Sequence, residues 1–273
     1  MEDLPESYRA TAAAGMPAAL QDKNSRQLYL IGKYEVTVAQ WDAIMKKVCP
    51  FDARTAMLPK TGISWHDAQS FDASLMEWVL ENSPDSLPSN KDDPRAVGQI
   101  RLPTEDEWEY AARGGHRVSS EEMSILDFFP IFEGEGMDDY SVFSNHNSPV
   151  LTAPSIIARR KPNPAGLYDT AGNVSEMTGD PYRIVVGNRL HGSAGGFVLK
   201  GGSFRSHIFG ILPGARDEQP FFFRTGAAKR DDMGFRLTLS SINIGSVTRL
   251  EEIQSELERL SQTDETLIQN ERR

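Results

Sequence analysis

Cysteine is almost absent from this sequence, because Cys49 is the single cysteine among 273 residues. One cysteine excludes an internal disulfide framework, a paired redox-cysteine motif and a zinc site built from several thiolates. A lone cysteine in a globular chain is usually a small buried apolar residue, and we expect that role for Cys49.

Long apolar runs and strong positive charge are lacking as well. No stretch approaches the roughly 18 to 20 apolar residues of a membrane-spanning helix, and the first four residues lack the basic start of an export signal. The sequence therefore predicts a soluble chain. Its net charge is −10, and its one compact basic run, residues 159–161, is too short to attract a phosphate backbone, so we expect no nucleic-acid partner.

What the chain does contain suits a large folded domain. Its composition is 39% apolar and 9% aromatic, which is enough for a substantial core. We divide the chain into a loosely ordered lead-in (1–27), a main domain (28–240) and a C-terminal amphipathic helix with a tail (241–273). The helix carries a narrow apolar stripe that packs on its own domain or binds a partner. The stripe consists of Leu250, Ile253, Leu257 and Leu260.

Three helix starts are marked by capping pairs, in which a serine or threonine precedes an acid or glutamine by three residues. The pairs are Thr37 with Gln40, Ser64 with Asp67, and Thr104 with Glu107. They predict helices over 38–47, 64–82 and 104–114. From about residue 118 to 240, frequent Gly, Pro and Asn predict short strands and long structured loops, and residues 191–196 read as a flexible glycine-rich loop rather than a phosphate cradle.

Several motifs together resemble the formylglycine-generating-enzyme (sulfatase-modifying-factor) family. They are Arg101-Leu-Pro-Thr-Glu-Asp-Glu-Trp-Glu-Tyr-Ala-Ala-Arg-Gly-Gly115, Asn163-Pro-Ala-Gly-Leu-Tyr-Asp-Thr-Ala-Gly-Asn-Val-Ser-Glu176, Lys200-Gly-Gly-Ser-Phe204, Ala215-Arg216 and Met233-Gly-Phe-Arg236. With two shorter segments, the resemblance covers about residues 28–240. It implies an α+β fold, a variant of the C-type lectin fold with little regular secondary structure.

The catalytic equipment of that family is missing. Its oxidising members resemble one another in holding copper with two cysteines between the Gly-Gly-Ser and Ala-Arg elements, where soft thiolates suit Cu(I). In this sequence the interval 204–214 has no cysteine, and Ser206 stands at the first cysteine position. The family's Trp-Glu-Trp is here Ser175-Glu176-Met177, without either tryptophan. We expect no copper and no catalytic residue, and interpret the chain as a pseudoenzyme.

A structural calcium site is the one metal feature that the resemblance retains. The matching ligands are the carboxylates of Asp169 and Glu176 and the carbonyls of Gly172 and Val174. Hard oxygen donors on a tight turn suit calcium. In the alternative interpretation, the two carboxylates only cap local turns.

Recognition of a protein partner is the function that the resemblance leaves, since the family's peptide groove can persist without its chemistry. The candidate contacts are Phe221, Phe222 and Phe223, together with the stripe at Leu250, Ile253 and Leu257. Members without copper cysteines include envelope regulators of bacterial type VI secretion that act upstream of a threonine kinase. That likeness implies a membrane kinase or secretion component as partner and a periplasmic location, with the cytoplasm as the alternative.

Two other functions stay open. One is an enzyme with redesigned chemistry in the same pocket, for which Ser203, Ser206 and His207 form a possible hydrolytic set that lacks an orienting carboxylate. The other is calcium-dependent carbohydrate binding, suggested by the lectin-like fold.

Overall fold

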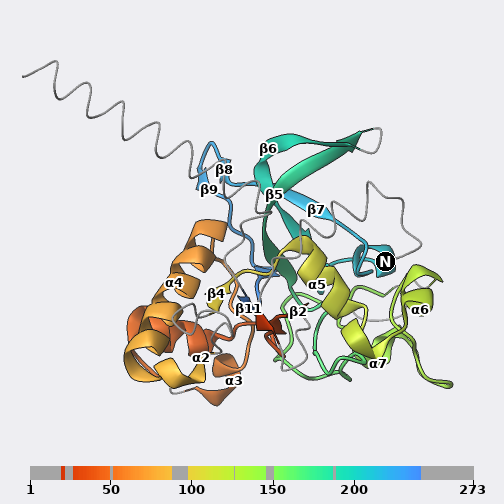
Figure 1. Ribbon diagram of the computed structural model, residues 1–273, viewed down its shortest axis with the longest axis horizontal. Helices are drawn as coiled ribbons and strands as arrows, with labels where there is room; N and C mark the ends of the chain where they lie inside the picture. Colours follow the sequence, from red (N-terminus) through yellow and green to blue (C-terminus); the bar gives the residue numbers. More distant parts are fainter. Residues whose placement is uncertain are drawn as a thin grey trace, which may run out of the picture.

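The computed structural model describes residues 20–21, 27–49, 52–87, 98–125, 127–145, 151–186 and 189–240. It confirms a mixed helix and sheet fold in which much of the described chain, especially residues 141–145 and 151–174, is irregular. Helices gather on one side, a long hairpin rises in the middle, and loops with short helices lie on the other side (Figure 1). Leu250, Ile253 and Leu257 lie outside the described residues.

The helical side is built from four consecutive elements. They are α2 (Val38–Trp41), the π-helical η1 (Asp42–Lys46), α3 (Ala53–Ala56) and α4 (Trp65–Asn82), and the 3-10 turn η2 (Pro84–Ser86) follows. Capping boxes at Thr37 and Ser64 start α2 and α4 as predicted. The first helix widens to π geometry at Asp42 and ends at Lys47, whose φ is 56°. Cys49 just beyond it is exposed, so the prediction of a buried cysteine is wrong.

The longest strands form a hairpin of β5 (Ser175–Val186) and β6 (Arg189–Lys200). With β7 (Asp217–Pro220) and β10 (Met233–Gly234) they make a sheet in the order β10-β5-β6-β7. The prediction of a flexible loop at 191–196 is wrong, because this segment lies in β6 and pairs with β5 through His191 opposite Ile184 and Ser193 opposite Arg183. Cross-strand pairing overrides the weak strand preference of its glycines.

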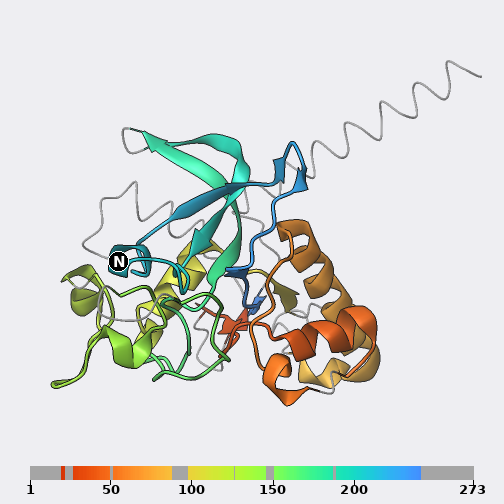
Figure 2. The ribbon, with the colours of Figure 1, turned by 180° about the vertical axis from the view of Figure 1, so that it is seen from behind.

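A three-stranded sheet joins distant parts of the chain. Its central strand β11 (Thr238–Ser240) pairs with both β3 (Leu30–Ile31) and β4 (Gln99–Arg101). Two further pairs are β1 (Leu20–Gln21) with β2 (Gln27–Leu28) and β8 (Phe222–Phe223) with β9 (Gly226–Ala227). The β8-β9 hairpin lies on the α4 side, away from the tip at which β5 and β6 join (Figure 2).

The remaining elements follow β4. Helix α5 (Glu105–Ala112) begins at the Thr104 capping box as predicted, and Gly114 with φ 104° follows its end. Then come η3 (Gly115–Arg117), α6 (Ser120–Ile125) and α7 (Met137–Tyr140), and η4 (Ile208–Gly210) follows β6. Within the described ranges, no helix is both long enough and apolar enough to cross a membrane.

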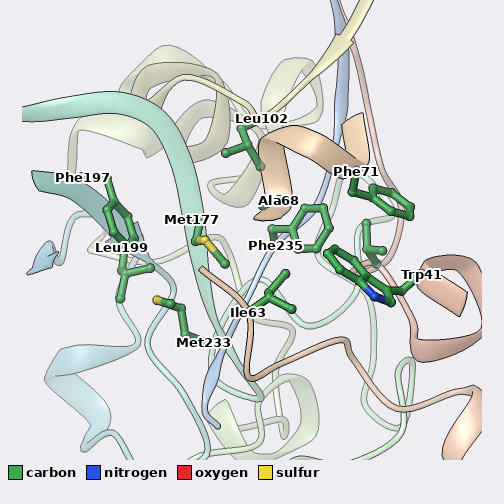
Figure 3. Close-up of a cluster of buried hydrophobic side chains, with 11 residues drawn as sticks. Trp41, Ile63, Ala68, Phe71, Leu102, Met177, Phe197, Leu199, Met233 and Phe235 are labelled. Carbon is green, nitrogen blue, oxygen red and sulfur yellow. The ribbon is translucent and has the colours of Figure 1, made fainter. Parts of the chain in front are cut away.

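The main core lies between α4 and the β5-β6 hairpin (Figure 3). Phe71 of α4 stacks on Trp41 with ring centroids 5.4 Å apart and meets Phe235 edge-on at 5.5 Å. On the sheet side, Met177 and Phe197 are fully buried in the same cluster. A second cluster around Phe128, Phe129 and Ile211 holds the loop side together, and Ile211 anchors the segment between β6 and β7 to it.

Candidate functional site

Ser206, the residue predicted to stand at the first copper-ligand position, is built into a tight turn. Its hydroxyl accepts a hydrogen bond from the backbone N–H of Ser203 at 2.9 Å, and its own N–H donates to the Ser203 carbonyl at 2.9 Å. Its carbonyl accepts from the N–H of Ser144, which ties the turn to the opposite loop. In this turn the Ser206 side chain acts as a structural acceptor.

Ser203 is also held by structural bonds. Its hydroxyl donates to Oδ2 of Asp232 at 2.9 Å and accepts from the N–H of Arg205 at 3.2 Å. Although burial raises the pKa of Asp232, hydrogen bonds from Arg230 and Ser203 bring that pKa below its ordinary value. In a hydrolytic triad an imidazole stands between serine and carboxylate, whereas here the carboxylate binds the serine directly.

Asp232 is a carboxylate that meets the predicted set, and it contacts the Ser203 hydroxyl directly. His207 is exposed, and its ring lies 5.7 Å from that of Phe209. Asp232 is engaged by the Arg230 guanidinium at 2.8 and 2.9 Å. Asp232 is 29 residues from Ser203 along the chain, so sequence spacing gave no signal that they meet.

A buried ionic network lies behind this turn. The Glu176 carboxylate accepts from Trp108 Nε1 at 2.7 Å and from Arg236 Nε and Nη2, both at 2.6 Å. The side chains of Glu176 and Arg236 are 0% exposed. Arg236 also donates to the carbonyls of Gly32 and Tyr168, so one guanidinium holds three residues from distant parts of the chain around it.

Glu35 extends the network and was not among the predicted site residues. Its carboxylate accepts from Asn173 Nδ2 at 2.6 Å and from the N–H of Val174 at 3.2 Å. Burial, and then the charges of Asp169 and Glu176, raise the pKa of Glu35 well above its ordinary value. Three buried carboxylic groups thus face the guanidinium of Arg236.

Three of the four predicted calcium ligands lie on a constrained turn, and the fourth, Glu176, lies at the start of β5. Asp169 and Gly172 have φ values of 57° and 80°, and a Cβ on Gly172 would lie 2.1 Å from the Val142 carbonyl oxygen. Asp169 Oδ2 accepts from the Ala158 N–H at 2.7 Å, while Glu176 is shared with Arg236. Across the described ranges, no three His, Cys, Asp or Glu side chains gather as a metal-binding group.

This donor set fits a hard cation in part. Two side-chain carboxylates and two carbonyls on a tight turn are oxygen donors of the kind that calcium takes, and a carboxylate oxygen with one hydrogen bond keeps a second lone pair. Three buried acidic groups, Glu35, Asp169 and Glu176, surround the single guanidinium of Arg236, and this excess of acidic groups also favours binding of a cation. Calcium at Asp169, Gly172, Val174 and Glu176 stays a prediction.

The three consecutive phenylalanines divide between core and surface. Phe221 packs on Trp65 and Phe197, with ring centroids 4.9 and 5.6 Å apart. Phe222 is 61% exposed and Phe223 50% exposed, and both belong to β8. The Phe222 ring lies 5.3 Å from that of His66 at the start of α4. An aromatic surface therefore continues outward from the core, and its role in partner binding stays a prediction.

Comparison with known proteins establishes the family. The family described as "Sulfatase-modifying factor enzyme 1-like domain" matches residues 7–241. The chain belongs to this family.

Curated relatives match parts of the chain. The chaperone protein LppX of Paenibacillus barcinonensis is 28% identical over 184 residues, which are 58% of this chain and 65% of that protein. The serine/threonine-protein kinase pkn1 of Chlamydia caviae is 36% identical over 124 residues, 45% of this chain and 14% of the kinase. The chain thus spans less than two thirds of either relative.

Solved structures share the fold. Treponema denticola variable protein 1 has a TM-score of 0.54 at 26% identity, covering 77% of this chain and 84% of that one. CarF has a TM-score of 0.57 at 23% identity, covering 77% and 85%. PvdO from Pseudomonas aeruginosa has a TM-score of 0.54 at 18% identity, covering 77% and 80%. The last two likenesses concern the fold alone.

Proposed function

We propose that this chain is a non-catalytic member of its family that acts by binding a protein partner. The observation that carries the proposal is the Ser206 hydroxyl, which accepts from the Ser203 N–H at 2.9 Å in a turn where the family resemblance predicts a copper-binding thiol. Cys49, the chain's one thiol, follows η1 on the helical side, while Ser206 follows β6. Two thiolates cannot meet at this turn within one chain, so copper-dependent oxidation of a substrate cysteine has no ligand set.

A kinase-linked pathway is the setting that we propose. The similarity to a region of a chlamydial serine/threonine kinase and to a protein named as a chaperone supports a family domain that works beside or upon other proteins. Within this proposal the chain resembles TagR, an accessory protein of type VI secretion, and promotes secretion from the periplasm through a threonine kinase. The cytoplasm is the alternative location.

A pull-down from envelope extracts of the native bacterium tests the partner. The bait is the full chain, compared with a Phe222→Ser, Phe223→Ser variant and with a control variant, Phe132→Ser, which alters another exposed phenylalanine. We expect a kinase or a secretion component to be retained by the wild type and the control but lost from the double variant. Retention of no specific protein by any bait, with tightly bound copper or iron in the pure protein, would contradict the proposal.

We also propose that calcium binds the turn at Asp169 and Glu176 as a structural ion. Its binding to the folded chain alone raises the melting temperature. We expect chelation by EGTA to lower Tm by several degrees in the wild type and to leave Tm unchanged in Asp169→Ala. An equal Tm with EGTA and with millimolar calcium in the wild type would exclude the site.

A further inference from the structure

The β8-β9 hairpin presents two phenylalanines that are exposed in the described part of the chain. Phe222 pairs with Ala227 and Phe223 with Gly226, and the turn between the strands is Arg224-Thr225. Neighbouring residues of a strand point to opposite faces, so Phe222 and Phe223 cannot both lie against the domain. Figure 1 shows this hairpin on the α4 side of the molecule, away from α6 and α7.

The base of the hairpin is firmly held. The Phe221 ring lies against Trp65, Phe197 and His66. The backbone carbonyl of Phe221 accepts a hydrogen bond from the N–H of Ala228 at 3.0 Å. Phe197 is 0% exposed, so this contact reaches the main core. A protruding element on a rigid base loses little conformational entropy when it binds, which makes it suited to insertion into a partner.

Arg224 gives the hairpin tip its charge. Nearby cations are already paired: Lys229 Nζ lies 2.8 Å from Asp67, and Arg230 contacts Asp217 at 2.9 Å as well as Asp232. In the described part of the chain, the exposed Arg224 side chain has neither an ion pair nor a hydrogen bond. An unpaired guanidinium beside exposed aromatic rings has the composition of interface hot spots.

We infer that the β8-β9 hairpin inserts into an apolar groove of a protein partner that is bordered by carboxylates. The phenylalanines fill the groove, and Arg224 pairs with a carboxylate at its edge. This inference rests on the proposed binding function. An anionic membrane fits less well, because one arginine adds only about a fivefold attraction to such a surface, while the chain as a whole carries a net charge of −10.

Photo-crosslinking in envelope extracts of the native bacterium tests the occupant. A photoreactive benzoylphenylalanine replaces Phe223 in the full chain, and a matched protein carries it at the exposed Phe132. We expect a protein adduct from position 223 whose cross-linked segment combines apolar residues with Asp or Glu. A segment without acidic residues, a lipid adduct, or an adduct to a second copy of this chain would overturn the inference.

The control position separates the two proposals. A specific protein adduct at position 132 without one at 223 would keep the binding function and reject this surface. The absence of specific adducts at both positions would count against the binding function itself.

A charge exchange then tests the role of Arg224. With the identified partner, Arg224→Glu is expected to weaken Kd at least about tenfold, and exchange of the partner's carboxylate for lysine should restore much of the loss. Lys229→Glu is the matched control, since Lys229 already has a partner in Asp67. Equal weakening by both variants, without rescue, would mean that only overall charge matters and would contradict the predicted pair.

Discussion

Replacing Arg236 with glutamine removes the guanidinium that faces Glu35, Asp169 and Glu176. The wild-type side chain makes two bonds to Glu176 and one each to the carbonyls of Gly32 and Tyr168, all between 2.6 and 2.9 Å. Removing one partner of a buried pair leaves the other charge uncompensated and costs about 3–5 kcal/mol. With an m-value of about 2 kcal/mol/M, the urea midpoint should fall by roughly 2 M.

A double-mutant cycle with Glu176→Gln isolates the ionic interaction. In Arg236→Gln, Glu176→Gln both charges are gone, so we expect the double variant to be at least about 1.5 kcal/mol more stable than the sum of the single effects predicts. The assay is urea unfolding followed by circular dichroism, in EGTA so that bound metal does not contribute. Additive effects, or a cost below about 1 kcal/mol for Arg236→Gln, would refute this reading of the network.

Three further predictions concern the same framework. Gly172→Ala should lower the free energy of unfolding by about 3 kcal/mol or more, because φ is positive there and the added Cβ would meet the Val142 carbonyl. The control Gly134→Ala also has a positive φ, 85°, but open space around it, so it should cost only about 1 kcal/mol. Urea unfolding measures both. Phe221→Ala should cost about 1–3 kcal/mol and Phe223→Ser less than about 0.5, so equal costs would contradict the anchored base. Burial raises the pKa of Asp72 to about 6, although backbone hydrogen bonds from Ala73 and Leu102 act to lower that pKa. Its protonated form therefore stabilises the fold below pH 4, and this contribution, about 1 kcal/mol after solvent screening, is lost as pH rises through 6. Asp72→Asn should flatten that decline, and an unchanged pH profile would show that Asp72 does not cause it.

The helix starts could be predicted because their signals are local. Thr37, Ser64 and Thr104 each meet a partner three residues on, and the structure has all three capping boxes. The fold class could be predicted as well, because each family motif is a continuous run of residues that is recognised without knowledge of tertiary contacts.

Contacts between distant segments could not be predicted in this way. The Ser203 bond to Asp232, the position of Glu35 beside Asn173 and the pairing of residues 191–196 within β6 all depend on tertiary packing. The exposure of Cys49, which lies two residues beyond the left-handed cap of η1 at Lys47, likewise depends on how this helix packs on the domain. Composition and periodicity carry no information on such pairings.

The proposed function is that this chain binds a partner and does not oxidise cysteine. The most direct test incubates the full chain with Cu(I), oxygen and a cysteine-containing peptide, and measures bound copper and the peptide mass. We expect neither stoichiometric copper nor conversion of the thiol to an aldehyde, with the Phe222→Ser, Phe223→Ser variant behaving like the wild type. Tightly bound copper together with aldehyde formation would contradict it.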